Sequence, residues 1–278
     1  MSYYRLLGLE KEPFSTSPDP KFFYESREHH AALMRLVIEI RLRRGLSVIL
    51  GDVGTGKTTL SRKLFQMLKE REDIIFHMIL DPTYDTEELF LNSLIRTFKL
   101  EIKNEHPTIL DYKEAIKDYL FKTGVEANKT IVLLIDEAQK LNSISLEILR
   151  VLLNYETNEY KLLQLVFLGQ LELLPHLREM NNLWDRISLK YVINPLDEQE
   201  TKEMIEFRLK VAGYNSSVEF FTEDAIREIY RYTQGYPRRI SLICHNALKA
   251  LMMDNKTVVD AALIRDLVAK DITATVQV

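Results

Sequence analysis

A short apolar run that ends in a glycine-rich turn constrains the fold of this chain more than any other feature. Residues 46–50 read Leu-Ser-Val-Ile-Leu, and the turn that follows contains Gly51, Gly54 and Gly56. The apolar run predicts a buried strand, and residues 58–70, with apolar side chains at helical spacing, predict a helix. A glycine-rich loop between a strand and a helix lets successive backbone N–H groups point inward. The pattern therefore predicts a phosphate-binding loop.

The spacing Gly51-x-x-x-x-Gly56-Lys57-Thr58 is typical of nucleoside triphosphate sites. We expect the loop backbone and the positive end of the following helix to bind the phosphates of ATP. Lys57 is expected to reach the β and γ phosphates, and the Thr58 hydroxyl to ligate Mg²⁺. The residues assigned to the nucleotide are Gly51, Asp52, Val53, Gly54, Thr55, Gly56, Lys57, Thr58 and Thr59. The alternative is a turn with a chance Lys-Thr pair, which the strand before it and the helix after it disfavour.

Two adjacent carboxylates end a second apolar run. Residues 130–135 read Thr-Ile-Val-Leu-Leu-Ile and lead into Asp136 and Glu137. A parallel strand covered on both faces delivers such acids to the carboxyl edge of its sheet. Because neighbouring strand residues point to opposite sides, we assign Asp136 to the Mg²⁺ shell and Glu137 to the attacking water. The alternative is a pair of acids that only ends a strand and caps the next helix.

Further polar residues occupy positions that suit nucleotide chemistry. Gln170 follows the apolar run 163–168 and Gly169, and its neutral amide can hold the attacking water or sense the γ phosphate. Arg186 can stabilise transition-state charge on the nucleotide of a neighbouring subunit, with Arg178 as the rival residue. Arg238, beside Arg239, can report bound nucleotide from the C-terminal region. Each of these residues could instead be an ordinary polar surface residue.

Strand-like and helix-like segments alternate as far as residue 195, which predicts a parallel α/β sheet. The predicted strands are 46–50, 74–79, 131–135, 163–168 and 189–193, and the predicted helices are 29–43, 58–70, 86–98, 109–122 and 143–155. Only helical segments follow, at 197–212, 222–233, 238–253 and 259–271, with Asp197 and Thr222 as N-caps and Glu200 at capping-box spacing. We therefore predict a first domain of residues 1–195, including an N-terminal arm, and a helical domain of residues 196–278.

Composition is consistent with a cytosolic enzyme. The single cysteine, Cys244, excludes an intrachain disulfide and is expected to be a buried thiol. No apolar run approaches the ~20 residues that cross a bilayer, and the first residues lack the apolar core of a signal peptide. The net charge of −4 argues against a protein that is basic throughout. We expect a cytoplasmic protein, free or peripheral at the inner membrane.

With these motifs in order, the chain resembles the AAA+ superfamily and, within it, the ExeA/GspA group that includes MshM-like ATPases of pilus systems. The motifs that carry the resemblance run nearly end to end: Tyr4-Arg-Leu-Leu-Gly8-Leu9, Pro13-Phe14, Pro18-Asp19-Pro20, Gly51 to Thr58, Asp136-Glu-Ala-Gln139, Leu152 to Thr157, Val166 to Leu173, Arg186-Ile187, Arg208-Leu209 and Gly235-Tyr-Pro-Arg238. Several of them are weak alone, but together and in the same order they are specific.

The resemblance implies a P-loop ATPase fold with strand order 5-1-4-3-2 and a C-terminal helical lid. It implies that Gln170 is sensor 1, Arg186 the arginine finger and Arg238 sensor 2, and that the N-terminal arm folds over the adenine. Members of the ExeA type also carry a transmembrane helix and a peptidoglycan-binding region. We expect this chain to be a short form without either, because no such segments follow the lid in the sequence.

Three functions fit the sequence. The first is a Mg-dependent ATPase that forms a nucleotide-dependent ring or filament and couples its nucleotide state to assembly of a secretion or type IV pilus machine through an envelope protein partner. The second, less favoured by the acidic net charge, is a DNA-bound AAA+ regulator similar to the transposition proteins TnsC and TniB. The third is a nucleotide-gated scaffold that barely hydrolyses ATP.

Overall fold

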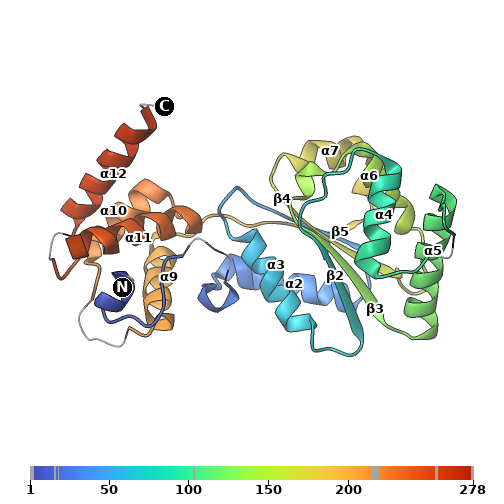
Figure 1. The fold of residues 1–278 in the computed structure, drawn as a ribbon, viewed down its shortest axis with the longest axis horizontal. Coiled ribbons are helices and arrows are strands. Elements are labelled where there is room, and N and C mark those ends of the chain that lie inside the picture. Colours follow the sequence, from blue (N-terminus) through green and yellow to red (C-terminus); the bar gives the residue numbers. More distant parts are fainter. Residues whose placement is uncertain are drawn as a thin grey trace. The chain divides into compact units, whose positions relative to one another are not determined.

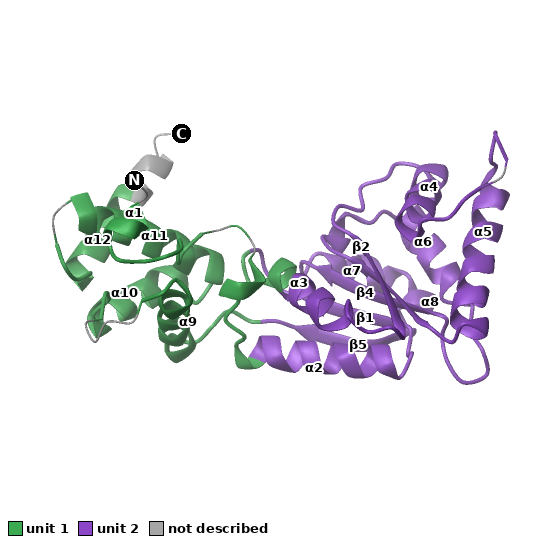
Figure 2. Ribbon diagram, turned by 60° about the horizontal axis from the view of Figure 1, so that its bottom comes forward, with its two compact units in different colours: residues 1–27, 54–59, 194–278 green, residues 28–53, 60–193 purple. Residues whose placement is uncertain are grey.

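The computed structural model describes residues 3–15, 17, 19–102, 104–214, 219–253 and 256–276 (Figure 1). The chain divides into two compact units, shown in different colours in Figure 2. Unit 1 comprises residues 1–27, 54–59 and 194–278, and unit 2 comprises residues 28–53 and 60–193. We describe each unit by itself.

Unit 2 is built around a five-stranded parallel sheet. Its strands are β1 (Leu46–Leu50), β2 (Ile74–Ile79), β3 (Thr130–Ile135), β4 (Leu163–Gly169) and β5 (Ile187–Val192). They pair in the order β2-β3-β4-β1-β5, and every pair is parallel. This order confirms the 5-1-4-3-2 topology that the family resemblance implied. The last strand begins earlier than predicted, because Ile187 already pairs with Leu46 before a register shift.

Helices cover both faces of this sheet, which explains why its central strands are buried throughout and mostly apolar, with Ser47, Thr130 and Gln164 as polar exceptions. The helices of unit 2 are α2 (Arg27–Arg41, whose first residue belongs to unit 1), α3 (Lys57–Leu68, continuing from the loop of unit 1), α4 (Glu87–Phe98), α5 (Ile109–Phe121), α6 (Ser143–Leu152), α7 (Leu173–Glu179) and α8 (Asn181–Trp184), with short helical turns η2 (Lys122–Glu126) and η3 (Ala138–Lys140). Alternate residues of β1, β3 and β4 pack with α4 to α8 in one buried cluster. Helices α2 and α3 lie on the opposite side of the sheet (Figure 1). The short helices α7 and α8 were not predicted.

Unit 1 is helical. Helices α9 (Glu198–Val211), α10 (Glu223–Thr233), α11 (Pro237–Met253) and α12 (Ala261–Val276) follow the last strand. The Asp197 side chain accepts the N–H of Glu200 at 2.7 Å and the Thr222 hydroxyl accepts that of Ala225 at 3.3 Å, so both predicted N-caps are present. The capping box of Asp197 and Glu200 is present as well. Buried Cys244 lies in α11, as expected, and burial raises the pKa of its thiol.

The N-terminal arm packs into the core of unit 1, which differs from its expected place in the first domain. The arm contains α1 (Tyr3–Leu6) and the turn η1 (Pro20–Phe22). Leu9, Phe14 and Phe22 of the arm are buried in one cluster with residues of α9, α10 and α11. Aromatic side chains on an arm must leave water, and the lid helices supply the apolar surface that accepts them. Pro18, which the sequence analysis included in the arm, lies outside the described residues.

Polar contacts of one arginine attach the arm to the lid helices. Arg208 of α9 donates to the carbonyl of Phe22 at 3.1 Å, to that of Ser15 at 3.5 Å and to the hydroxyl of Ser241 at 2.7 Å. Burial lowers the pKa of the Arg208 guanidinium to about 10, so it remains protonated at neutral pH. Ser241 in turn donates to the carbonyl of Pro237 at 2.8 Å. The Arg208 guanidinium thus donates hydrogen bonds to backbone carbonyls of the arm. Without it, these carbonyls would lose their hydrogen bonds to water on burial and gain none in return.

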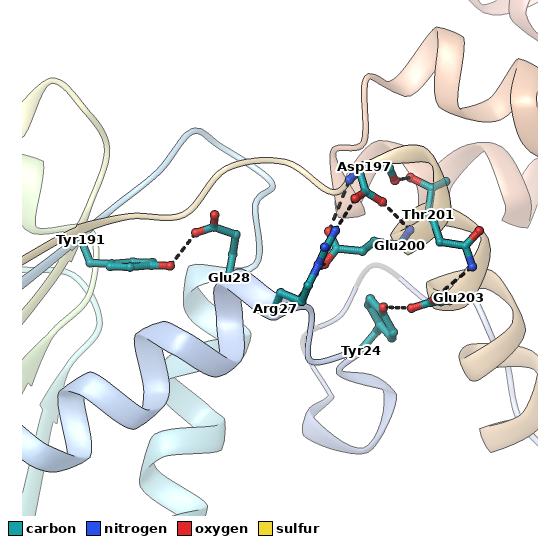
Figure 3. Close-up of polar contacts among 9 residues, drawn as sticks. Tyr24, Arg27, Glu28, Tyr191, Asp197, Glu200, Thr201 and Glu203 are labelled. Atoms are coloured by element: carbon teal, nitrogen blue, oxygen red, sulfur yellow. Dashed lines mark hydrogen bonds and ion pairs between the residues drawn. The ribbon is translucent and has the colours of Figure 1, made fainter.

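Charged and phenolic side chains hold the end of the arm and the first residues of α2 (Figure 3). Arg27 forms an ion pair with Asp197, and its Nε lies 3.2 Å from Oε1 of Glu200. Its backbone N–H also donates to Glu200, at 3.1 Å. Within unit 2, the neighbouring residue Glu28 accepts a hydrogen bond of 2.7 Å from the hydroxyl of Tyr191 on β5. Arg27, at the end of this segment of unit 1, and Glu28, the first residue of unit 2, are therefore each held by side-chain contacts within their own unit.

Gly235 occupies a position in unit 1 where any side chain would clash with neighbouring backbone unless that backbone moved. Its φ is +74°, and a Cβ atom there would lie 1.8 Å from the carbonyl oxygen of Leu196. The backbone carbonyl of Gly235 also accepts the N–H of Leu196 at 3.0 Å. The glycine therefore sets both the left-handed turn before α11 and the close approach of the segment that leads into α9.

We expect Gly235→Ala to lower the free energy of unfolding by at least about 3 kcal/mol, because a steric clash adds to backbone strain. Gly8→Ala is the matched control, since Gly8 has φ +76° but no atom lies within 4 Å of the position that its Cβ would take. It should cost only about 1–2 kcal/mol, the strain of a left-handed residue. Urea denaturation of both variants measures the difference. Equal costs would show that the contact with Leu196 is unimportant.

Candidate functional site

The parallel sheet places three of the predicted motifs at one edge of unit 2. The N–H of Gly51, directly after β1, donates to the carbonyl of Gly169 at the end of β4 at 3.2 Å. Asp136 follows β3, and its N–H donates to the carbonyl of Ile79 at the end of β2 at 2.8 Å. Gln170 directly follows Gly169. The carboxyl ends of β1, β3 and β4 therefore bring these motifs to the same side of the sheet.

The glycine-rich loop has the backbone that a phosphate-binding loop requires. Gly54 and Gly56 have φ angles of +86° and +100°, and residues that carry a Cβ atom rarely adopt such backbone angles. Helix α3 begins at Lys57, and an α-helix has no internal acceptors for its first N–H groups. These N–H groups and the helix dipole favour an anion at this end. Lys57 itself is 7% exposed. The loop thus fits the phosphates of a nucleotide.

The two adjacent acids lie in a backbone conformation different from the one expected. Asp136 is 2% exposed, and its Oδ1 accepts the N–H of Glu137 at 3.0 Å. Glu137 is not a strand residue: its φ of +53° puts it in the left-handed region. The prediction that a strand pleat separates the two side chains was therefore wrong. Both acids follow β3 rather than lie within it, and a left-handed conformation at a non-glycine residue is a strained feature often found at functional sites.

Gln139 connects Glu137 with the end of β4, a role that the sequence analysis did not assign. Its amide nitrogen donates to Oε2 of Glu137 at 2.7 Å, and its Oε1 accepts the backbone N–H of Gln170 at 3.1 Å. The only signal in the sequence was its place two residues after Glu137 in the motif Asp136-Glu-Ala-Gln139.

The two arginines at the start of α11 differ in their surroundings within unit 1. The backbone N–H of Arg238 donates to the carbonyl of Gly54 at 3.2 Å. A Cβ on Gly54 would lie 3.0 Å from Cβ of Arg238, so Gly54 also permits this close approach. The guanidinium of Arg239 instead lies 4.8 Å from the ring centre of Tyr236. Of the two, Arg238 is the residue next to the phosphate loop.

The two candidate finger residues lie in the segment of short helices before β5. Nε of Arg186 donates to the carbonyl of Asn182 at 3.1 Å. The guanidinium of Arg178 lies 5.5 Å from the ring centre of Trp184, whose ring is also approached by Nζ of Lys190 at 3.9 Å. Arg178 therefore makes a cation–π contact with Trp184, whereas the Arg186 side chain bonds to the backbone of the short helix before it.

The described part of the chain contains no group of three or more His, Cys, Asp or Glu side chains that could hold a metal ion. A divalent ion such as Mg²⁺ typically takes only one or two protein ligands and completes its shell with water and substrate phosphates. Thr58 and Asp136 are the residues present that suit such a site. In the same described part, no helix is both long and apolar enough to cross a membrane.

Comparisons with known proteins agree with this architecture. The AAA domain family matches residues 40–177. General secretion pathway protein A of Aeromonas hydrophila is 40% identical over 250 residues, which are 89% of this chain and 44% of that protein. An uncharacterized HTH-type transcriptional regulator of Methanocaldococcus jannaschii is 28% identical over 298 residues, with 94% of this chain and 72% of that protein covered. The chain thus spans less than half the length of the secretion relative.

Solved structures show the same fold. The ORC2 protein of Aeropyrum pernix, solved as ADPNP–ADP complexes, superposes with a TM-score of 0.68 at 17% identity and covers 94% of this chain and 71% of its own. At this identity the likeness concerns the fold alone. The match of the AAA domain family and the 40% identical relative show that the chain belongs to the AAA+ family of P-loop proteins, in the group of general secretion pathway protein A.

Proposed function

We propose that this protein binds ATP with Mg²⁺ and hydrolyses it to ADP and phosphate. The observation that carries the proposal is the buried Lys57 at the first position of α3, directly after a loop with two left-handed glycines. The second element of the chemistry is the turn of Asp136 and Glu137 at the carboxyl end of β3. Phosphoryl transfer needs little more than positioning and charge neutralisation, and these residue types supply both.

The proposed roles follow the chemistry of each group. The loop from Gly51 to Thr59 binds the phosphates through its N–H groups, and Lys57 neutralises charge on the β and γ phosphates. Thr58 and Asp136 hold Mg²⁺, and Glu137 orients the attacking water. Gln170 senses the γ phosphate. Arg238, which contacts the loop at Gly54, reports the bound nucleotide to the lid helices.

Binding and hydrolysis should be separable by substitution. Lys57→Ala should weaken ATP binding at least tenfold, because it removes a phosphate contact, whereas Glu137→Gln should bind ATP normally and lose turnover at least a hundredfold. Isothermal titration and phosphate release measure the two effects. Lys69→Ala, an exposed lysine just beyond α3, is the control and should change neither. Full turnover by Glu137→Gln would overturn its assignment.

We further propose that the ATPase serves assembly of a secretion or type IV pilus machine, at the cytoplasmic side of the inner membrane and through an envelope protein partner. Support comes from the identity with general secretion pathway protein A, which extends over 89% of this chain. AAA+ proteins couple nucleotide state to the arrangement of neighbouring subunits, so we propose a ring or filament whose formation depends on nucleotide.

An arginine that acts on a neighbour's nucleotide makes activity depend on assembly. Specific activity should therefore rise with protein concentration, and Arg186→Ala should bind ATP yet abolish this rise. Arg178→Ala should retain it, because that side chain is engaged with Trp184. Phosphate release across a dilution series, with light scattering in parallel, measures both.

Mixing the Arg186→Ala and Glu137→Gln variants tests the same proposal directly. An Arg186→Ala chain keeps Glu137, and a Glu137→Gln chain keeps Arg186, so one interface of the mixture combines an intact site with an intact finger. Some hydrolysis should return in the mixture. A strictly monomeric protein with full activity at every concentration would refute the assembly model.

A DNA-bound regulator is the second candidate, favoured by the 28% identical relative that is described as an HTH-type transcriptional regulator. Phosphate contacts to DNA give a steep dependence of affinity on salt. A mobility shift of duplex DNA that requires ATP and weakens steeply between about 50 and 200 mM salt would support this function. We expect no such shift, because the net charge of the chain is −4.

A further inference from the structure

The side chain of Gln139 makes two hydrogen bonds whose directions are chemically determined. The backbone N–H of Gln170 can only donate, so it must face the amide oxygen, at 3.1 Å. The amide nitrogen then faces Oε2 of Glu137 at 2.7 Å, and an ionised carboxylate can only accept. Exchange of the amide oxygen and nitrogen would place two acceptors together at one end and two donors at the other. The bridge therefore has a single favourable orientation.

Both ends of this bridge are attached to well-fixed backbone. Gln139 lies in the single turn η3, directly after the left-handed residue Glu137. At the other end, β4 pairs with β1 on one side and β3 on the other. A Cβ on Gly169 would lie 3.4 Å from Oε1 of Gln139 and 3.5 Å from its backbone nitrogen, so the end of β4 packs directly against this residue. The position of Gln139 is thus determined by the central strands of the sheet.

We propose that Gln139 is a positioning residue that holds the Glu137 carboxylate in place relative to the end of β4. The inference rests on the proposed ATP hydrolysis, in which Glu137 orients water. A glutamate side chain has three rotatable bonds, and a hydrogen bond to a fixed amide restricts them. Correct placement matters because small displacements of a catalytic group cost large factors in rate.

The bridge also links two residues with different proposed roles. Gln139 is bonded to the backbone of Gln170, whose side chain is the proposed sensor of the γ phosphate, and to the carboxylate that orients water. A shift of the Gln170 backbone therefore changes the position of Glu137 through one side chain. The bond uses the Gln170 backbone, so replacing the Gln170 side chain leaves the bridge intact.

The variant Gln139→Glu tests the bridge with almost no change in shape. It keeps an acceptor for the N–H of Gln170, but it puts a second carboxylate against Glu137 in place of an N–H donor. We expect kcat to fall at least tenfold while the dissociation constant for ATP changes less than twofold. Gln139→Leu, which lacks both bonds, should show the same separation of kcat from affinity.

Gln199→Glu is the matched control. Gln199 makes the same kind of bond in unit 1, from its amide nitrogen to Oε1 of Glu203 at 2.9 Å, at an exposed place on α9. It should leave kcat and ATP affinity unchanged. The control therefore separates the loss of any amide–carboxylate bond from the loss of the one at Glu137.

The exchanged pair Glu137→Gln with Gln139→Glu separates positioning from a merely structural role. It restores a donor and an acceptor at the bridge with the two groups interchanged. Thermal stability lost in Gln139→Glu should return in the exchanged pair, whereas turnover should stay as low as in Glu137→Gln alone. If the bridge only stabilised the turn, Gln139→Glu would unfold more easily but keep wild-type kcat at temperatures where it is folded.

The outcomes for the two proposals are distinct. A wild-type protein that releases no phosphate from ATP at any concentration overturns the proposed hydrolysis and the role of Gln139 with it. A wild-type protein that hydrolyses ATP, together with folded Gln139→Glu and Gln139→Leu variants of unchanged kcat, overturns the role of Gln139 alone. A loss of ATP affinity equal to the loss of kcat would also refute positioning, since Gln139 would then act on binding.

Discussion

The parallel pairing of β1, β3 and β4 is the constraint on which the candidate site depends. In parallel strands all carboxyl ends meet at one edge, so the residues that leave these strands are brought together wherever they lie in the sequence. Gly51 is more than eighty residues before Asp136, and both follow a strand of the same sheet. Helices on both faces hold this sheet, and the central strands are mostly apolar because they have no face in water.

The two units differ in how their backbone N–H and C=O groups obtain hydrogen bonds. Unit 2 satisfies its backbone through strand pairing and helices, and its buried Asp136 directly follows β3. Unit 1 has no sheet among its described residues, and it includes an arm with irregular backbone. The Arg208 guanidinium donates hydrogen bonds to two carbonyls of the arm, as the N–H groups of a neighbouring strand do in a sheet. Burial lowers the pKa of this arginine to about 10, which leaves it charged under ordinary conditions.

Glu137, within one of the motifs, is one of several non-glycine residues of the described chain in a left-handed conformation. Gly54 and Gly56 adopt positive φ angles easily because glycine has no Cβ atom. Glu137 adopts a positive φ angle although it has one. Surrounding contacts must hold Glu137 in this state, and the bond from Gln139 is one of them. A residue held in this way is ready before any ligand arrives, which lowers the cost of ordering it during a reaction.

The sequence by itself determined the sheet, its strand order through a family resemblance, the glycine-rich loop and the two N-caps at Asp197 and Thr222. Apart from the strand order, these features depend on patterns within a few residues, such as hydrophobic periodicity, glycine spacing and a capping box, so they can be read without knowing the tertiary contacts. Tertiary structure alone decided the place of the arm, the turn at Glu137 and the bridge through Gln139. An apolar arm must be buried, but its sequence does not say against which helices. Likewise, the partner of a glutamine amide depends on which strand end lies beside it, and that is decided by the pairing of strands distant in the chain.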